Sequence, residues 1–534
     1  MPLDVIIVGA GIGGLCAAIA LRRAGHSVRI FEKSRFASEI GAAVAISPNG
    51  ALVLAALGFS FDRARACVLP SWESVDGISL SPLTALDLSN AEAKYGAPMM
   101  AIHRVDLHSE LRRLALEGDD NPAELVLATA AEGIDDEGRL LLSDGSTHRA
   151  DLIIGADGVH SVVRRAVVGE EADLAAETDM SAFRFLIPTS RLQGDPALEK
   201  LLQWKSPGAT IFADTLDKAH ERHLVWYPCQ GGDVQNVVGI HPTRPNAAET
   251  DFKASLLDEF RYFNPDVVKL LELAEDVKCW KLARYEPFPR WTRKDIVLVG
   301  DAAHPMLPFG AQAANQAIED GAALGQLLRG VDDAAEIPHR LQLFEDIRRR
   351  RTAIIQILSS ARIGREGTVT DKLREFVADG ESVPTTFAER TEHAYRFALL
   401  FLSPYGCNSG VRLIDPFEKS SFDVLKECEK ALQQEEKKET ATEELNEKEK
   451  ENLAVLSNNN AKGEDLQDPN NYNYDKGCAR LLLAYSVRLF KPFKPFLRMI
   501  YITLIIRVYY TKEEERNKGR NIRSIPRYYS HSWL

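Results

Sequence analysis

This sequence of 534 residues has few cysteines, no excess of basic charge and few long apolar runs. The seven cysteines are scattered and form no CxxC pair, which argues against a cysteine-rich motif and favours reduced thiols in a cytoplasmic protein. The formal net charge of −12 argues against binding to nucleic acid. We therefore expect no metal site and no nucleic-acid partner.

The C-terminal region differs in composition from the rest of the chain. Residues 432–475 are charged and of low complexity, which predicts a solvated linker. Residues 476–534 carry 13 Lys and Arg against 3 Asp and Glu, and the longest charge-free run within 481–510 has eight residues. A membrane span needs roughly 20. This basic aromatic tail is open to two interpretations, contact with an anionic membrane surface or an extension without function, and we favour the second.

The first motif is a glycine-rich turn between a strand and a helix. An apolar run at 3–8 leads directly into Gly-Ala-Gly-Ile-Gly-Gly, and after a helical pattern a second strand ends at Glu32. Gly9 allows a tight turn, Gly11 lets the backbone approach a pyrophosphate, and Gly14 permits close packing of helix on strand. Glu32 is placed to accept hydrogen bonds from a ribose. The pattern predicts a dinucleotide site and a strand, rather than a signal peptide, at the N-terminus.

Two later strands also end in Gly-Asp. The run 151–155 leads to Asp157, and the run 297–300 leads to Asp301, followed by a turn and a helix that extends to about residue 329. The start of a helix offers free N–H groups and a positive dipole end, which suit an anionic group. Each unit alone is equally well an ordinary strand–turn–helix. The third such unit in one chain favours a ligand site.

Between these motifs lie two segments with less specific signals. Residues 39–50 combine small residues with turn formers, as in a plain loop or in a segment laid against a flat ligand. Arg104 opens a helix, where its charge opposes the local dipole, so we expect an anionic partner for it. From 176 to about 290, short alternating runs predict an antiparallel sheet with helices packed nearby.

Together the three motifs resemble the single-component FAD-dependent aromatic hydroxylases, a family of monooxygenases that includes the fungal salicylate hydroxylase-like enzymes. The resemblance covers roughly residues 3–431. It implies an α/β fold in which a Rossmann-type FAD-binding domain is interleaved with an antiparallel-sheet substrate domain, followed by C-terminal helices. The expected boundaries are 1–75 with 100–175 and 285–330 for FAD binding, 76–99 with 176–284 for substrate, and 331–431 for the helices.

The same resemblance implies roles for individual residues. The glycine loop would hold the FAD pyrophosphate and Glu32 the adenosine ribose, while Arg104 matches an arginine near the FAD phosphates. Asp157 matches a residue shared between FAD and the nicotinamide cofactor, and Asp301 one at the ribityl or phosphate region. The residues that match backbone lying against the flavin are Ala45 and Ala314.

The substrate side is less specific. Arg184 matches a sheet arginine that some fungal members place against a phenolate, and a structural ion pair is the competing interpretation. Tyr227 and His223 are further pocket candidates, although buried core aromatics explain them equally well. Pro308 resembles a proline beside the flavin ring. Ala313 occupies a position at which relatives usually carry glycine. If that position needs φ > 0 or close backbone approach, which alanine permits less readily, we expect flavin binding or flavin movement to be altered.

The family implies hydroxylation of a phenolic or polyketide-like aromatic, with NAD(P)H and O₂, through a flavin C4a-hydroperoxide, in secondary metabolism or aromatic catabolism. The sequence contains no second GxGxxG, so the nicotinamide cofactor would dock transiently. Two alternatives are epoxidation of an isoprenoid olefin and a non-catalytic flavoprotein whose tail serves as a binding module. Neither the substrate nor the choice between NADH and NADPH follows from the sequence.

Overall fold

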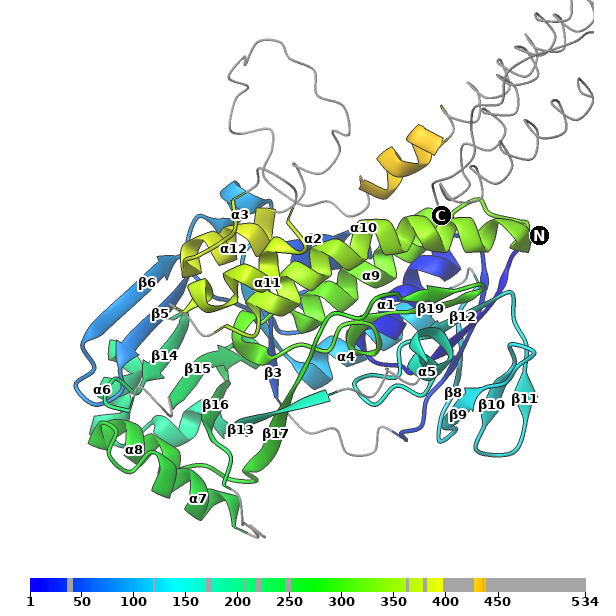
Figure 1. Cartoon of the computed structure of the whole chain (residues 1–534). Coiled ribbons are helices and arrows are strands. Elements are labelled where there is room, and N and C mark those ends of the chain that lie inside the picture. The colour runs from blue at the N-terminus through cyan, green and yellow to red at the C-terminus, as the bar shows by residue number, and fades with distance from the viewer. Residues whose placement is uncertain are drawn as a thin grey trace, which may run out of the picture. The chain divides into compact units, whose positions relative to one another are not determined.

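The computed structural model describes residues 1–35, 42–118, 121–169, 175–205, 207–217, 222–244, 251–361, 365–377, 382–396, 427–435 and 437 (Figure 1). The chain divides into two compact units, Met1–Ala441 and Thr442–Leu534, and all described residues belong to the first. The predicted tail, including 481–510, lies outside the described residues. Residues 427–435 form a helix, so helical structure continues slightly past the expected linker start at 432.

The first layer is a six-stranded sheet built around the N-terminal strand. Four of its residues are buried, as expected for a central strand covered on both faces. The order is β18-β19-β12-β1-β2-β8, parallel except for the β18–β19 pair. Its strands are β1 (Asp4–Val8), β2 (Ser27–Phe31), β8 (Glu124–Val126), β12 (Leu152–Gly155), β18 (Thr292–Arg293) and β19 (Ile296–Leu298). The three predicted motifs follow β1, β12 and β19, so they meet at one edge.

Helices α1 (Ile12–Arg23) and α9 (Ala313–Leu327) pack against each other, and α10 (Ile337–Leu358) runs along α9 (Figure 1). A Cβ on Gly321 would stand 2.5 Å from the backbone nitrogen of Ala17, so only glycine allows this approach of α9 to α1. The other helices are α2 (Pro48–Ala56), α3 (Ala91–Tyr95), α4 (Arg104–Leu116), α5 (Val163–Val168), α6 (Pro196–Trp204), α7 (Phe252–Glu259), α8 (Pro265–Glu272), α11 (Thr370–Arg374) and α12 (Phe387–Arg396).

The second layer is a seven-stranded sheet of order β17-β13-β16-β15-β14-β5-β6. It is antiparallel, as expected, except that β14 and β5 are parallel. Its strands are β5 (Ser71–Asp76), β6 (Pro82–Asp87), β13 (Ala175–Pro188), β14 (Ala209–Ala213), β15 (His223–Cys229), β16 (Val234–Pro242) and β17 (Lys278–Tyr285). Because β5 begins at Ser71, this sheet takes in residues that we had assigned to the FAD-binding domain.

The two faces of this sheet have different partners. The outer face packs on α6, α7 and α8 through large apolar side chains such as Phe183, Phe212 and Trp226. We call the opposite side of the sheet the inner sheet face. Residues that pair across neighbouring strands point to the same side of a sheet, so the pairing identifies the residues of this face. Its members are Trp280, Arg184, Leu186, Asn236, Tyr227, Trp72 and Leu86.

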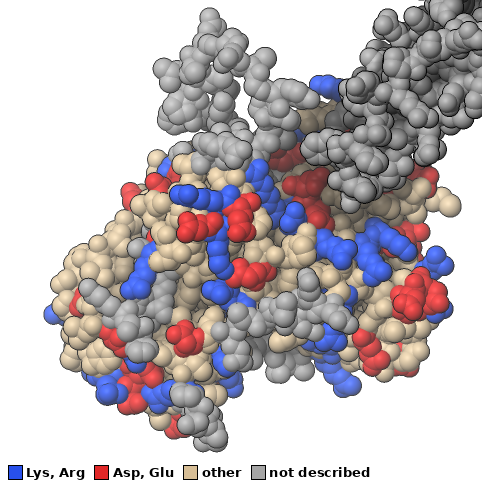
Figure 2. All heavy atoms as spheres, in the orientation of Figure 1, with Lys and Arg blue, Asp and Glu red and all other residues tan. Residues whose placement is uncertain are grey.

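Two small sheets complete the unit: β3 (Ala43–Ile46), β7 (Met100–His103) and β4 (Cys67–Val68), and β9 (Ala131–Ile134), β10 (Leu140–Leu142) and β11 (Thr147–His148). On the visible face of the described residues, basic and acidic side chains are interspersed (Figure 2). Within the described part of the chain, no helix combines the length and the apolar character that crossing a membrane requires.

Candidate functional site: a nucleotide cleft and a facing sheet

The glycine loop after β1 has the geometry that a dinucleotide motif requires. Gly9 has φ +101°, and a Cβ there would stand 2.4 Å from the carbonyl oxygen of Ala156. A Cβ on Gly14 would stand 2.1 Å from the Gly9 oxygen, so this residue holds α1 close to the loop. In contrast, a Cβ on Gly11 would meet no protein atom within 4 Å. Gly9 and Gly14 therefore shape the turn, and Gly11 leaves room for a group such as a pyrophosphate.

Glu32 lies immediately after β2 and is largely buried, with 9% of its surface exposed. Its Oε2 accepts a hydrogen bond from the Ala10 amide at 2.8 Å, and Oε1 accepts one from the Ser34 amide at 2.7 Å. Each carboxylate oxygen keeps a second lone pair. The side chain thus fixes the glycine loop and retains capacity for a ribose hydroxyl, which stays a prediction.

The second and third motifs are joined by Arg164, a fully buried residue to which the sequence pattern had given no role. Its guanidinium donates to the carbonyl oxygens of Ala302 at 2.7 Å and Asp301 at 3.0 Å, and also to that of Val159. Asp157 Oδ2 accepts from the Val162 amide at 2.7 Å, whereas Oδ1 is buried without a hydrogen-bond partner. That unfilled acceptor fits a hydroxyl of a bound cofactor.

Asp301 and Arg104 supply the free charges of this cleft. Asp301 is open to water, yet protein surrounds it closely enough that desolvation raises its pKa, against the opposing effects of His304, Arg104 and Arg164. Exposure to water and desolvation by the protein are both expected for a carboxylate that points into a deep, water-filled cleft. Arg104 is exposed at the start of α4 and, among the described residues, has no ion pair. The charges of Asp301 and Arg104 lie close enough to interact, and both remain available to a ligand.

The turn before α9 was predicted to face the flavin. The residue with a left-handed backbone is Ala311, with φ 52° and ψ 33°, whereas Ala313 begins the helix in an ordinary helical conformation. Position 313 therefore does not require φ > 0, and the other possibility named above, close backbone approach, stays a prediction. Asn315 Nδ2 donates a hydrogen bond to the Ala45 carbonyl oxygen at 3.1 Å, which ties β3 to α9. Ala314 lies half-buried in the first turn of α9.

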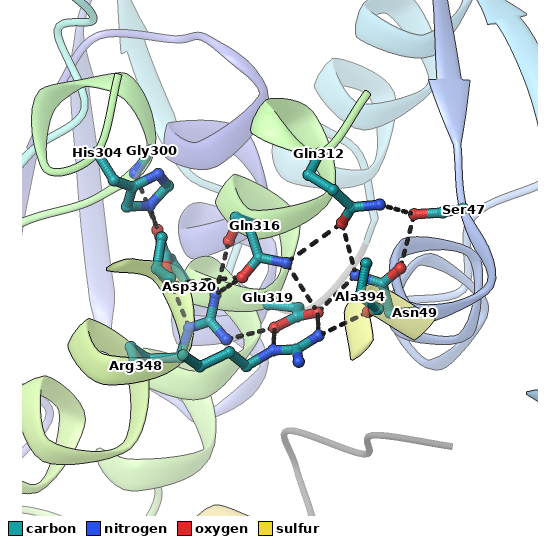
Figure 3. A network of polar contacts seen from close by, with 12 residues as sticks. Ser47, Asn49, Gly300, His304, Gln312, Gln316, Glu319, Asp320, Arg348 and Ala394 are labelled. Atoms are coloured by element: carbon teal, nitrogen blue, oxygen red, sulfur yellow. Dashed lines mark hydrogen bonds and ion pairs between the residues drawn. The ribbon is translucent and has the colours of Figure 1, made fainter. Parts of the chain in front are cut away.

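Below this turn lies a buried polar cluster, here called the α9–α10 network, which the sequence analysis missed (Figure 3). Its acidic and basic members are Glu319, Asp320, Arg348 and Arg351, and its other members are Ser47, Asn49, Gln312, Gln316 and His304. The sequence did contain a signal for this cluster, because Glu319 and Asp320 are adjacent acids inside an otherwise Ala- and Gly-rich helix. Two carboxylates face two guanidinium groups, so the formal charges of these four residues cancel.

Bidentate and charge-assisted contacts satisfy the carboxylates of the network. Glu319 accepts from both Nε and Nη2 of Arg351 at 2.9 Å and also from Arg348. Asp320 accepts from Arg348 Nε at 2.8 Å and from the Gly300 amide at 2.9 Å, and contacts His304 Nε2 at 2.6 Å. Burial alone would raise the pKa of Asp320, but the charges of His304 and Arg348 outweigh it and lower the pKa to about 2.

The network also holds the cleft wall in place. Gln312 Nε2 donates to Ser47 Oγ at 2.9 Å, which fixes the residue immediately before α9 (Figure 3). At the other end, Arg351 Nη2 donates to the carbonyl oxygen of Ala394 in α12 at 3.2 Å. The loop beside the predicted flavin position and helix α12 are therefore both anchored to α9 and α10.

Arg184 and Tyr227 both belong to the inner sheet face, which lies against β3. Tyr227 is buried and donates to the Ala43 carbonyl oxygen at 3.0 Å, and Asn236 Oδ1 accepts from the Ala43 amide. Burial raises the pKa of Tyr227 despite the nearby positive charge of Arg184. Its hydroxyl proton is thus committed to the backbone, which favours a structural role for Tyr227.

Arg184 behaves differently. Its guanidinium lies over the ring of Trp280, 5.6 Å from the centroid, and its Nε is buried without a hydrogen-bond partner. Burial lowers its pKa, Tyr227 opposes this shift, and the charge of Arg104 adds to it. No ion pair to a described carboxylate neutralises Arg184, so the structural ion pair considered above has no support among the described residues. A half-buried guanidinium that lacks a carboxylate partner among the described residues suits an anionic ligand. His223, the weaker candidate, lies 5.9 Å from the Phe309 ring, centroid to centroid.

A cavity opens at the other end of the inner sheet face. Its interior, without the open mouth, is about 30 Å³, so it has room for the end of a ligand rather than for a whole one. The walls come from the inner sheet face, from the turn 309–312, from α10 and from α12, and the polar or aromatic residues among them are Trp72, Phe309, Gln312, Ser359, Arg390, Thr391 and Tyr395. The structure therefore brings the predicted flavin-facing turn and the sheet together around one hollow.

Comparison with known proteins agrees with this geometry. Residues 2–355 match the family described as FAD binding domain. The chain is 35% identical over 381 residues to the FAD-dependent monooxygenase phomE' of Diaporthe leptostromiformis, covering 70% of this chain and 94% of that one. It is 34% identical to hispidin-3-hydroxylase of Neonothopanus nambi over 377 residues, which covers 66% and 86% of the two chains.

Among solved structures, Klebsiella pneumoniae HpxO in complex with FAD and uric acid superimposes with a TM-score of 0.59 at 25% identity, over 70% of this chain and 92% of that one. These matches confirm the resemblance to FAD-dependent aromatic hydroxylases and the predicted α/β fold. They also identify FAD as the cofactor. The glycine loop, the open Asp157 Oδ1 and Arg104, which has no ion pair among the described residues, fit that group.

Proposed function

Because the chain belongs to the family of FAD-dependent monooxygenases, we propose that it hydroxylates a phenolic or polyketide-like aromatic with O₂ and NAD(P)H. FAD, when bound, supplies the redox chemistry and the activation of O₂. The single observation that carries the substrate class is Arg184, a half-buried guanidinium with no carboxylate partner among the described residues. Two relatives, hispidin-3-hydroxylase and 3-hydroxybenzoate 6-hydroxylase, are named for phenolic substrates.

The proposed role of Arg184 is electrostatic. A cation beside a phenol favours the phenolate, and the phenolate donates electron density to the ring carbon that is to be hydroxylated. Trp280 holds the guanidinium in place from one side, so the positive charge is oriented before the substrate enters. Tyr227 positions β3 through Ala43 rather than acting on the substrate.

The cofactor cleft would divide its work among the predicted residues. Gly9, Gly11 and Gly14 would admit the pyrophosphate, and Glu32 would receive the adenosine ribose. Backbone at Ala45 and Ala314 would lie along the flavin, with the free amide groups of the first turn of α9 directed at negative charge on it. Arg104, Asp157 and Asp301 would hold the phosphate and ribityl region, with NAD(P)H docking transiently.

A substrate screen tests this proposal. FAD-loaded protein should consume NADH or NADPH faster in the presence of some aromatic acids or acylated resorcinols, and mass spectrometry should show one added oxygen atom in the product. Product mass also separates simple from decarboxylative hydroxylation. If no phenolic compound stimulates consumption while an isoprenoid olefin does and yields an epoxide, the phenolic proposal is wrong.

Arg184→Ala sharpens the same test. We expect a loss of roughly 100-fold in kcat/KM on phenolic substrates, because removal of a charge-assisted contact costs about 1.5–3 kcal/mol and the rate effect adds to it. Tyr227→Phe, on the same sheet face, should retain turnover within a few-fold. Unchanged turnover in Arg184→Ala would point to epoxidation, which needs no phenolate. A chain that ends at residue 441 addresses the tail-based alternative: loss of product formation there would support it.

A further inference from the structure

The cavity walled by α12 contains two buried hydrogen-bond donors without acceptors. Arg390, from α12, has a side chain that is only 5% exposed. Its Nη1 donates to the Ala361 carbonyl oxygen at 2.8 Å and lies 3.5 Å from Glu366 Oε1, but its Nη2 has no hydrogen-bond partner. Nη2 lies 3.1 Å from the point at which a Cβ on Gly310 would stand. Because Gly310 lines the cavity, the free end of Arg390 is directed at this hollow.

The second donor comes from a different element. Trp72, on β5, lines the same cavity, and its indole Nε1 is buried and has no hydrogen-bond partner. An unsatisfied buried donor costs roughly 1–3 kcal/mol, so such groups are rare unless a ligand completes them. An indole N–H and a guanidinium N–H can only donate. Whatever fills the cavity must therefore bring acceptor atoms.

The charge balance narrows the class of acceptor. Burial lowers the pKa of Arg390 to about 10, with the charge of Glu366 opposing the shift, so the guanidinium stays protonated at neutral pH. Glu366 is fully buried beside it and largely neutralises it. A full negative charge on the ligand is thus not required. A carbonyl or phenolic oxygen supplies the acceptor lone pairs that these donors need. The apolar remainder of the lining, such as Leu86 and Leu358, suits a short acyl chain.

The wall that carries Arg390 is held in a fixed position. Arg351 donates to the Ala394 carbonyl oxygen, Tyr395 OH contacts Met99 Sδ at 3.5 Å, and the rings of Tyr95 and Tyr395 meet edge to face at 5.4 Å. A donor on such a wall loses little freedom when it binds, which makes its hydrogen bond more selective.

We propose that this cavity takes the oxygen-bearing end of the aromatic substrate that lies away from the hydroxylated ring position, and that Arg390 Nη2 and Trp72 Nε1 donate hydrogen bonds to its carbonyl or phenolic oxygen. The inference rests on the proposed function and deepens it. Arg184 would act on the reacting phenol, and the two donors would select the oxygen-bearing substituent.

A matched pair of ligands tests the inference without turnover. 4-Butyrylresorcinol and 4-butylresorcinol have the same carbon skeleton and differ by one carbonyl oxygen. Their dissociation constants for the FAD-loaded protein can be measured from perturbation of the flavin absorbance. We expect the wild-type protein to bind the butyryl compound about tenfold more tightly, as one or two added hydrogen bonds predict.

Two conservative variants and one control locate the effect. Arg390→Lys keeps the charge beside Glu366 but removes Nη2, and Trp72→Phe keeps an aromatic ring but removes Nε1. Each should weaken binding of the butyryl compound by about three- to tenfold and leave the butyl compound unchanged. Trp204→Phe, on α6 and 44% exposed, should change neither.

The outcomes separate this inference from the proposed function. Equal binding of the two compounds by the wild type, equal weakening of both by the variants, or no binding of either compound would overturn the inference. If the expected pattern of dissociation constants is found but no phenolic compound is hydroxylated, the donor site stands and the proposed function fails.

Discussion

The α9–α10 network and the inner sheet face are both polar regions buried in the same unit, but they are completed in different ways. In the network, Glu319 and Asp320 face Arg348 and Arg351, and the protein itself supplies nearly every hydrogen bond. Along the inner sheet face and the adjoining cavity, the unsatisfied donors include Arg184 Nε, Asn236 Nδ2, Trp72 Nε1 and Arg390 Nη2, and beside Arg390 the two carboxylate oxygens of Glu366 also lack a hydrogen-bond partner. The first region is closed by its own residues, and the second awaits acceptors from a ligand.

This contrast teaches how to separate scaffold from site. A buried charge with its partner present is a matter of stability, because breaking the pair leaves the other charge desolvated. A buried donor with no acceptor is a matter of function, because the structure has left a bond to be formed. His304 Nδ1 is one exception within the network, since it too is buried without a hydrogen-bond partner.

The largest expected effect comes from breaking the closed region. Arg348→Met should lower the free energy of unfolding by about 3–5 kcal/mol, because it leaves Glu319 and Asp320 undercompensated in the interior. Urea unfolding checks this. Arg261→Met removes an ion pair between Arg261 and Asp258, whose side chains are 70% and 53% exposed respectively. This substitution should lower the free energy of unfolding by less than about 1 kcal/mol. Similar losses in both variants would contradict the distinction.

The same network predicts acid sensitivity. The pKa of Asp320 is about 2 in the folded protein and roughly 3.9 in an unfolded chain. A carboxyl with a depressed folded pKa contributes stability that is present above the unfolded value and lost as the pH falls from about 4 toward 2. Unfolding measured across that window should show this loss in the wild type and less of it in Asp320→Asn.

An intermediate effect compares two glycines of the same loop. Gly14→Ala should destabilise the apoprotein by about 1–3 kcal/mol, because the added Cβ meets the Gly9 oxygen. Gly11→Ala meets no protein atom, so the apoprotein should keep its stability while FAD affinity falls at least tenfold. Thermal unfolding without FAD and FAD titration separate the two. If Gly11→Ala leaves FAD affinity intact, the pyrophosphate does not approach there.

The smallest effect concerns the turn before α9. Ala311→Gly should stabilise the protein by up to about 1 kcal/mol, because glycine adopts the left-handed conformation more readily. Ala313→Gly should instead destabilise it by about 0.5–1 kcal/mol, as glycine does inside a helix, and should leave FAD affinity within about twofold. A large gain in FAD affinity for Ala313→Gly would instead support the prediction that close backbone approach is needed at that position.

The cofactor half of the molecule could be predicted from local sequence because its chemistry is local. A glycine turn between a buried strand and a helix creates its own anion site, and an acid at the end of the next strand is carried to it by the parallel register of β1 and β2. The family and the cofactor followed from three such motifs in order. Residue roles within that cleft, from Glu32 to Asp301, remain predictions that the geometry supports.

Tertiary structure alone decided the rest, since the decisive contacts join residues far apart in the chain. Arg164 reaches from the second motif to the third, and Arg351 reaches from α10 to α12. For Tyr227 the sequence left a pocket residue and a core aromatic equally open, and the hydrogen bond from its hydroxyl to the Ala43 carbonyl oxygen favours the core aromatic. Whether a polar side chain stabilises the fold or waits for a ligand depends on the partner opposite it, and sequence spacing does not specify that partner.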